Sequence, residues 1–202
     1  MLAYQGQNYT GAYKLLLPLA KKGYAPAMAQ LAYMYEYGIG VRKDAGEAGK
    51  LYKKLLSHYM AEAQQGDAEA QYQVGQLHYG GKGVPENIPE AMRWYAKAGE
   101  NGHLESQYKL ALLFDSGEKA PRDPQASVLW YTKAAEQGHA KSQMFLAIKY
   151  YRGRDVEDIE VRGLRLDTLL KGSGFEEDDI HFVIIDVEGA EEEVLRGALD
   201  TL

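Results

Sequence analysis

Hydrophobic residues between positions 68 and 103 follow a helical spacing in two successive runs. In the first run, the residues of one face stand at positions i, i+4, i+7 and i+8, the spacing of a helix with one buried side: Ala70, Val74, Leu77 and His78. This run ends in the glycine-rich segment 80–83, where positive φ angles can stop a helix. The second run, residues 89–100, has a similar face: Ala91, Trp94, Tyr95 and Ala98. The pattern predicts a pair of helices, called helix A and helix B below, joined by a glycine loop and closed by a tight turn at 101–102.

The same pattern returns after 36 residues. Segments 68–103 and 104–139 share thirteen identical positions, which in the first copy are Glu69, Gln71, Tyr72, Leu77, Gly81, Pro85, Trp94, Tyr95, Lys97, Ala98, Glu100, Gly102 and His103. Chance would give roughly two or three identities from the background frequencies of common residues. A period of this length indicates one supersecondary unit stacked on copies of itself, so the sequence predicts a solenoid.

The repeat extends in both directions. Residues 25–41 align with 68–84, and seven additional residues lengthen helix B of this first repeat by almost two turns, which preserves the direction of its apolar face. Upstream, 8–23 has the pattern of a lone helix B, in which Pro18 is expected to kink or shorten the helix. Downstream, 140–153 repeats helix A. The solenoid thus spans 1–153, with helix B at 8–23, repeats at 24–66, 67–102 and 103–138, and helix A at 139–153; residues 154–202 form a separate segment.

Three strings within the repeats carry a family resemblance. They are AEAQYQVG at 68–75, GKGVPEN at 81–87 and AMRWYAKA at 91–98, and they resemble the Sel-1-like repeat, a helical repeat of tetratricopeptide type. The resemblance implies a mainly α fold, a right-handed α/α solenoid of helix pairs. The C-terminal tail is expected to add a small α/β fragment. It also implies a non-catalytic scaffold or adaptor that binds a protein or peptide on a concave helix-A surface.

The charge and aromatic composition change at the boundary near residue 153. Residues 1–153 hold 18 Lys and Arg against 14 Asp and Glu, whereas 154–202 hold 5 against 15; all 16 tyrosines precede residue 152. The net acidity and the lack of a basic stripe argue against nucleic acid as the main partner. The chain has no cysteine, which excludes disulfides and thiol chemistry.

The sequence has no segment typical of membrane insertion or export. No window approaches 18 consecutive apolar residues, and the first residues lack the basic and apolar regions of a signal peptide. On the assumption that the N-terminus is complete, we expect a cytoplasmic protein without membrane insertion.

The tail carries a second resemblance. The segment 180–185 is apolar and branched like a buried strand, and 190–199 has one helical apolar face, so the alternation suggests a piece of an α/β layer. The strings LDTLL at 166–170 and IDVEGAEEEVLRGA at 185–198 resemble the C-terminal half of FkbM-type methyltransferases, which use S-adenosylmethionine in a Rossmann-like fold. The cofactor-binding half of that family has no match here, and Ile184 occupies a position where a lysine is expected.

Two interpretations of the tail acids remain open. If the chain is an enzyme, the resemblance implies an S-adenosylmethionine-dependent methyltransferase in which Asp186 and Glu188 act at the end of a strand as a base or as acceptors for a substrate hydroxyl. The alternative is that these acids cap the helix that follows. The scaffold hypothesis assigns no catalytic residue and no cofactor. A third hypothesis makes the tail a remnant or a gene-fusion junction with only a capping role.

Other apparent motifs fit the repeat better than a ligand site. The segments Gly38-Ile39-Gly40 and Gly81-Lys82-Gly83 follow helices rather than strands, so we interpret them as structural turns and not as phosphate loops. His103 and His139 share one repeat position in the turn before helix A, and the histidines have no partners at metal-ligand spacing.

The candidate binding residues lie on helix A, on the side away from helix B. Tyrosine and other large side chains bring contact area at a small entropic cost. The alternative is that these side chains pack between neighbouring helices. The predicted partner-binding residues are Tyr33, Tyr72, Gln76, Tyr108 and Ile148.

Overall fold

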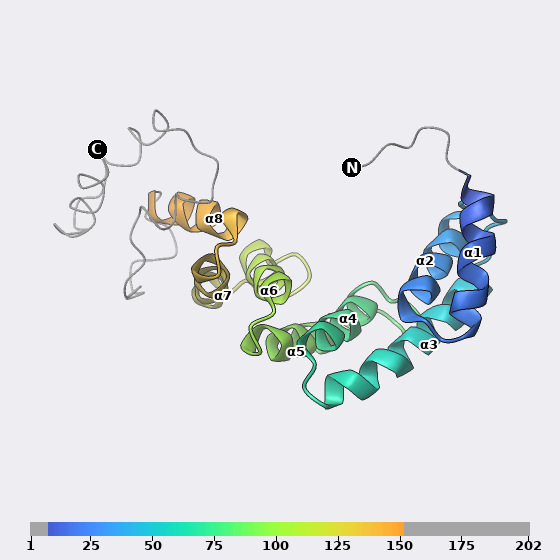
Figure 1. Cartoon of the computed structure of the whole chain (residues 1–202). Helices are drawn as coiled ribbons and strands as arrows, with labels where there is room; N and C mark the ends of the chain where they lie inside the picture. The colour runs from blue at the N-terminus through green and yellow to red at the C-terminus, as the bar shows by residue number, and fades with distance from the viewer. Residues whose placement is uncertain (1–7, 152–202) are drawn as a thin grey trace. The chain divides into compact units, whose positions relative to one another are not determined.

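The computed structural model describes residues 8–151, and the regular structure of this range is all helical (Figure 1). The helices are α1 (Tyr9–Lys21), α2 (Ala25–Tyr37), α3 (Ala45–Gln64), α4 (Ala68–Tyr79), α5 (Ile88–Glu100), α6 (Leu104–Ser116), α7 (Pro124–Glu136) and α8 (Ala140–Tyr151). The predicted helix pairs are therefore confirmed as α2 with α3, α4 with α5 and α6 with α7. The α/β elements expected within 154–202 lie outside the described residues.

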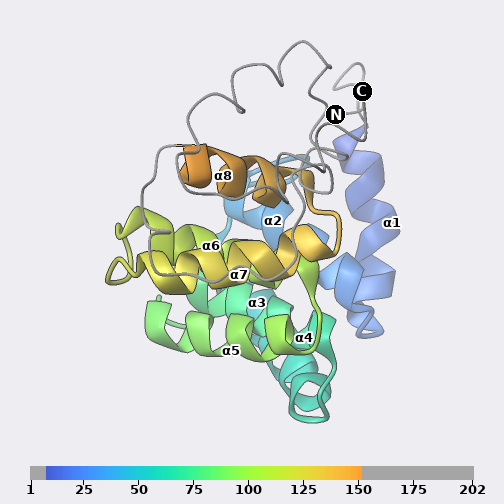
Figure 2. The same cartoon turned by 90° about the vertical axis from the view of Figure 1, so that its left-hand side faces the viewer.

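The chain divides into two compact units, Met1–Asn101 and Gly102–Leu202. In the first unit each helix from α1 to α4 packs on the next one along the chain. In the second unit α6 packs on α7 and α7 packs on α8. Figure 2 shows these three helices. Each pair joins a helix with A character to one with B character, so the alternation predicted from the sequence is also the order of packing.

Helix α3 confirms the insertion, and α1 is not shortened at Pro18. The 20 residues of α3 exceed the 13 of α5 and α7 by seven. Helix α1 does not end at Pro18 but continues to Lys21, and the amide of Lys22 bonds to the carbonyl of Pro18 at 3.3 Å. Proline lacks a backbone N–H, so it cannot donate the helical hydrogen bond at its own position. The residues that follow a proline in the last turn can still donate their amides to carbonyls one turn earlier.

Short polar side chains fix the start of most helices. The side chains of Asn8, Asp44, Asp67, Asn87 and Asp123 each accept a hydrogen bond from the backbone amide three residues later. Such an N-cap satisfies an amide that has no partner within the helix. The caps at Asp44, Asn87 and Asp123 place helix B in the same register in each repeat.

That register brings one tyrosine of each helix B into the core. Tyr52, Tyr95 and Tyr131 stand eight residues after the respective caps, and each is at most 7% exposed. Tyr95 lies so close to α4 that a Cβ added at Gly75 would come within 2.6 Å of its ring. Small residues on helix A therefore allow the aromatic rings of helix B to fill the core of each pair.

The glycine loop of each repeat in the first unit touches the preceding helix B. Gly83 has a φ of +75°, and an added Cβ would lie 2.6 Å from the backbone nitrogen of Lys53 in α3. Gly40 has a φ of +70°, and its added Cβ would lie 2.5 Å from the Cβ of Tyr9 in α1. Because L side chains rarely adopt such angles and no space exists for one, both positions require glycine. The interpretation of these segments as structural turns is confirmed.

A polar contact beside Gly83 also joins the first two repeats. The hydroxyl of Tyr52 donates a hydrogen bond to Glu36 Oε2 at 2.6 Å, and Lys82 Nζ lies 3.3 Å from the same oxygen. Burial opposes ionisation of Glu36, but the Tyr52 hydrogen bond and the Lys82 charge together hold the pKa of this carboxyl below its ordinary value. The carboxylate thus remains charged and bonds to both repeats.

We predict that Gly83→Ala destabilises the chain by about 2–4 kcal/mol, because it combines backbone strain with a clash against the α3 backbone. Gly66→Ala is the matched control. Gly66 has a φ of +96°, but no atom lies within 4 Å of its added Cβ, so its cost is limited to about 1–2 kcal/mol of strain. Urea unfolding followed by circular dichroism measures both, and equal losses would refute the role of the close contact.

Candidate functional site

In the first unit, Tyr72 and Gln76 lie one turn apart on α4 and contact each other. The Gln76 side-chain amide donates to the Tyr72 hydroxyl, and the Tyr95 hydroxyl donates to Gln76 Oε1 at 2.9 Å. The rings of Tyr72 and Tyr95 have their centroids 5.8 Å apart. Gln76 is therefore held in one orientation by a half-buried tyrosine and a fully buried one.

Burial keeps the Tyr95 hydroxyl a donor. Desolvation, with smaller contributions from Tyr72 and Tyr79, raises the pKa of Tyr95 far above its ordinary value. Tyr95 is thus neutral throughout the physiological range, and its proton fixes Gln76 Oε1 as the acceptor. The amide nitrogen of Gln76 is directed toward Tyr72, at the outer edge of the pair.

Helix α2 presents the largest exposed aromatic pair of the described helix-A residues. Tyr33 is 41% exposed and Tyr37 is 55% exposed, and their ring centroids are 4.6 Å apart. Two adjacent tyrosine rings with one accessible face can contact an apolar side chain while their hydroxyls reach polar groups. Sequence reasoning identified Tyr33 but missed Tyr37, although its spacing of four residues on a helix was a signal for the pair.

In the second unit, Tyr108 occupies the repeat position of Tyr72. Its ring lies 6.2 Å from that of Tyr131 and 4.5 Å from that of His139, centroid to centroid. Burial, and then the charge of Glu105, raises the pKa of Tyr108. Leu112 stands where Gln76 stands in the preceding repeat, and within residues 8–151 the buried hydroxyl of Tyr131 finds no hydrogen-bond partner.

Ile148 on α8 is 38% exposed. It shares its repeat position with Tyr33 and Gln76, so this outward position holds a different residue in each repeat. The next residue, Lys149, is instead buried, and its Nζ bonds to Asp115 Oδ1 at 2.5 Å.

Of the five predicted binding residues, the structure brings Tyr72 and Gln76 together on α4 and places Tyr33 on α2 of the same unit. Tyr108 and Ile148 belong to the second unit.

His103 and His139 act as helix caps. The Nδ1 atom of His103 accepts from the amide of Ser106 at 3.2 Å, and that of His139 accepts from the amide of Ser142 at 3.3 Å. Burial lowers the pKa of His139, which favours the neutral form that a cap of this kind requires. The sequence identified this position only as a turn, because histidine is an uncommon N-cap.

The described part of the chain contains no candidate metal site and no candidate membrane-spanning helix. Across residues 8–151, no three His, Asp or Glu side chains are grouped as metal ligands would be. No helix in the same range combines the length and apolarity needed to cross a bilayer. Asp186 and Glu188, the acids that a methyltransferase would use, lie outside the described residues.

We predict that Leu112→Gln stabilises the second unit by about 1 kcal/mol, because it supplies the Tyr131 hydroxyl with the acceptor that Gln76 gives to Tyr95. The reciprocal change, Gln76→Leu, removes that acceptor and is expected to cost about 1–3 kcal/mol. Thermal unfolding by differential scanning calorimetry compares the two variants. A destabilising Leu112→Gln would show that the two helix pairs do not share this geometry.

Comparison with solved structures supports the fold. A Sel1 repeat protein from Oxalobacter formigenes matches with 33% identity and a TM-score of 0.53, covering 74% of this chain and 57% of that one. A protective antigen of uropathogenic Escherichia coli with an SLR fold matches with 32% identity and a TM-score of 0.51, covering 73% of this chain and 30% of that one.

Two curated proteins match parts of the chain. HRD3, an ERAD-associated E3 ubiquitin-protein ligase component of Candida glabrata, is 42% identical over 55 residues, or 27% of this chain and 7% of HRD3. A negative regulator of exopolysaccharide production from Rhizobium meliloti is 30% identical over 108 residues, or 47% of this chain and 38% of the regulator. The chain thus matches well under half the length of either relative.

The family assignment agrees with the helix pairs. The Sel1 repeat model matches residues 25–57, 68–103 and 104–139, which together make up more than half of the chain. Sel1 repeats typically mediate protein binding. The comparisons give no support to an FkbM-type methyltransferase fragment. The chain belongs to the Sel1 repeat family, and it is a Sel1 repeat scaffold homologous to parts of HRD3 and of the rhizobial regulator.

Proposed function

We propose that the chain is a non-catalytic scaffold that binds a protein or peptide segment on its helix-A faces. The binding residues are Tyr33, Tyr72 and Gln76 in the first unit and Tyr108 and Ile148 in the second. The observation that carries this proposal is the exposed pair of Tyr33 and Tyr37 on α2. Packing within the helix pairs does not account for two large aromatic side chains that remain about half exposed side by side.

The helix-A positions differ in what they can contribute to binding. Tyr33 and Tyr37 supply exposed aromatic area, and residues of this type supply much of the energy in protein interfaces, about 2 kcal/mol or more when central. Gln76 supplies an oriented amide whose position two tyrosines fix. Because the rings and the amide are held before binding, little conformational entropy remains to be lost.

The relatives are compatible with such a role. One is a component of a ubiquitin ligase and the other is a negative regulator of polysaccharide production, and neither description requires catalysis by the repeats themselves.

The outward position of helix A changes from one repeat to the next. It holds Tyr33, Gln76, Leu112 and Ile148 in turn. A surface whose repeats share a framework but differ in this residue suits recognition of one particular segment.

We predict that Tyr33→Ala weakens peptide binding at least tenfold, because it removes exposed aromatic area without opening the core. Peptides selected from a displayed library on the full chain serve as probes, and fluorescence anisotropy measures their dissociation constants. Tyr72→Phe, which removes only the hydroxyl bonded to Gln76, is expected to weaken the same peptides about threefold to tenfold.

Leu129→Ala is the matched control, because Leu129 is a large exposed residue, 53% accessible, on the helix-B element α7. It should leave both affinity and melting temperature unchanged. Selected peptides whose affinity is insensitive to Tyr33→Ala and Tyr72→Phe, but falls with Leu129→Ala, would refute the helix-A site.

A further inference from the structure

The exposed tyrosine pair of α2 occupies positions that stay accessible in the next repeat. Gln76 stands at the repeat position of Tyr33 and is partly exposed, and Gly80 stands at that of Tyr37 and is exposed. The helix pair of α2 and α3 precedes this second repeat in the stack, and it does not cover either position. The accessibility of the tyrosine pair is therefore a property of the repeat and does not depend on what precedes α2.

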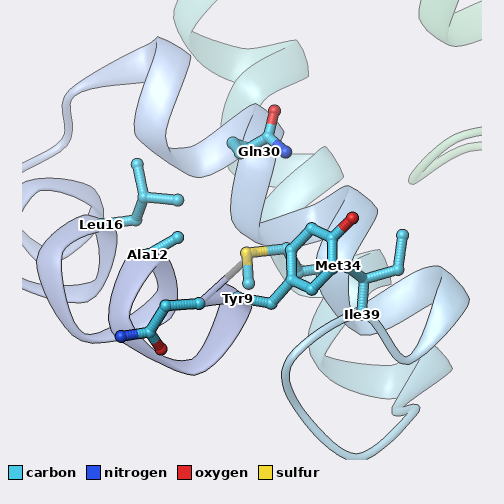
Figure 3. Close-up of a pocket in the computed structure, with 7 residues that line it drawn as sticks. Tyr9, Ala12, Leu16, Gln30, Met34 and Ile39 are labelled. Carbon is cyan, nitrogen blue, oxygen red and sulfur yellow. The ribbon is translucent and has the colours of Figure 1, made fainter. Parts of the chain in front are cut away.

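The side of α2 that faces the preceding helix is a different one. Met34 lines a pocket between α2 and α1, and neither tyrosine of the pair lines it (Figure 3). The pair lies instead on the side of Tyr52 in α3. Burial, followed by Glu36, raises the pKa of Tyr52, and the hydroxyls of Tyr37 and Tyr33 add to this effect.

The two rings of the pair form one aromatic surface and not a slot. Their centroids are 4.6 Å apart, and their planes are tilted by 46°. Rings at this distance are in contact, so no ligand side chain fits between them. A compact, rigid ring such as that of proline can lie against their exposed faces, as it does in the aromatic-lined grooves that bind the polyproline II (PPII) conformation.

The polar groups on these helix-A positions are hydrogen-bond donors. Besides the tyrosine hydroxyls, the Gln76 amide nitrogen carries two hydrogens, of which one is directed to the Tyr72 hydroxyl. A PPII segment has no internal hydrogen bonds, so its backbone carbonyls are available as acceptors. The carbonyls of an α-helix are already bonded, and helix A presents no strand edge for a β-strand. The donors thus match an extended proline-rich segment.

Charge gives the partner no preferred sign. Residues 24–101, the two complete repeats of the first unit, contain eight Lys and Arg against nine Asp and Glu. Glu36, which precedes Tyr37, already bonds to Tyr52 and Lys82. Because burying a charge is costly unless it is paired, this surface favours a segment without net charge.

We propose that the helix-A face of the first unit binds an uncharged, proline-rich segment of a partner protein in the PPII conformation. Its proline rings lie on Tyr33 and Tyr37, and its carbonyls accept from the tyrosine hydroxyls and the Gln76 amide. Helices α2 and α4 both pack on α3, so they lie within about 20 Å of each other, a span that about seven PPII residues cover. This role rests on the proposed scaffold function, because it uses the same surface.

Selection of random linear peptides, displayed on phage, against the full chain tests the class of segment. The bound peptides are expected to be enriched in proline at least about threefold over the unselected library and to lack net charge. Exchange of the prolines of a selected peptide for alanine should weaken its binding about tenfold, because the exchange removes the ring contact and the preformed conformation. Fluorescence anisotropy measures these affinities.

Variants of the full chain locate the proline rings. Tyr37→Ala should weaken the proline-rich peptides about tenfold, whereas Tyr37→Phe retains the ring and should cost no more than about threefold. Tyr24→Ala is the matched control. Tyr24 is 56% exposed and precedes α2 without a side-chain cap bond, so its exchange should change neither the affinity nor the melting temperature.

The outcomes separate the class of segment from the scaffold function itself. Selected peptides that lose affinity with Tyr33→Ala but lack proline enrichment, carry a net charge or become helical on binding would overturn the PPII segment and leave the scaffold function standing. A selection that returns no peptide, or peptides insensitive to both Tyr33→Ala and Tyr37→Ala, would overturn both.

Discussion

The close approach of a loop glycine to the preceding helix B is the constraint on which the stacking of the first unit depends. At Gly83 the loop between α4 and α5 touches the backbone of α3, and at Gly40 the preceding loop touches α1 in the same way. Without a side chain at these positions, the loop backbone reaches the helix and the hydrogen bond from Tyr52 to Glu36 forms beside it. The next repeat can then place its helix A against the previous helix B in one register.

Within this framework the two helices of a repeat have different roles. Helix B provides a buried tyrosine, a buried apolar residue three positions later (Leu55, Ala98 or Ala134) and a capped start, which recur because they fill the core. Helix A faces helix B with small residues and directs the remaining positions outward. Those positions change from Tyr33 to Gln76, Leu112 and Ile148, so substitutions there alter the surface without altering the stack. This separation of core and surface explains how a repeat scaffold can acquire a specific partner.

The framework also explains why α1 differs from its counterparts. It has the helix-B pattern and packs on α2 as α3 packs on α4. Its leucines have the spacing of a core face, yet in the described part of the chain Leu15 and Leu19 are exposed. An apolar stripe of this kind on a helix end is costly to leave in water.

The sequence by itself determined the helices, their order and the glycine turns. These features depend on local chemistry: periodic apolar residues, and glycine where φ is positive. It also identified the outward residues Tyr33, Tyr72, Gln76, Tyr108 and Ile148 as candidates, since the repeat defines which side of helix A meets helix B. Their role in binding stays a prediction.

Only the tertiary structure decided which of these side chains are exposed and what they contact. The exposed pairing of Tyr33 with Tyr37, the position of Gln76 between two tyrosines, and the burial of Lys149 against Asp115 depend on neighbouring elements. The same apolar pattern is buried in α5 and exposed in α1, because burial depends on whether another helix covers the face. A periodic sequence specifies the face of a helix, but the packing of the chain decides what that face meets.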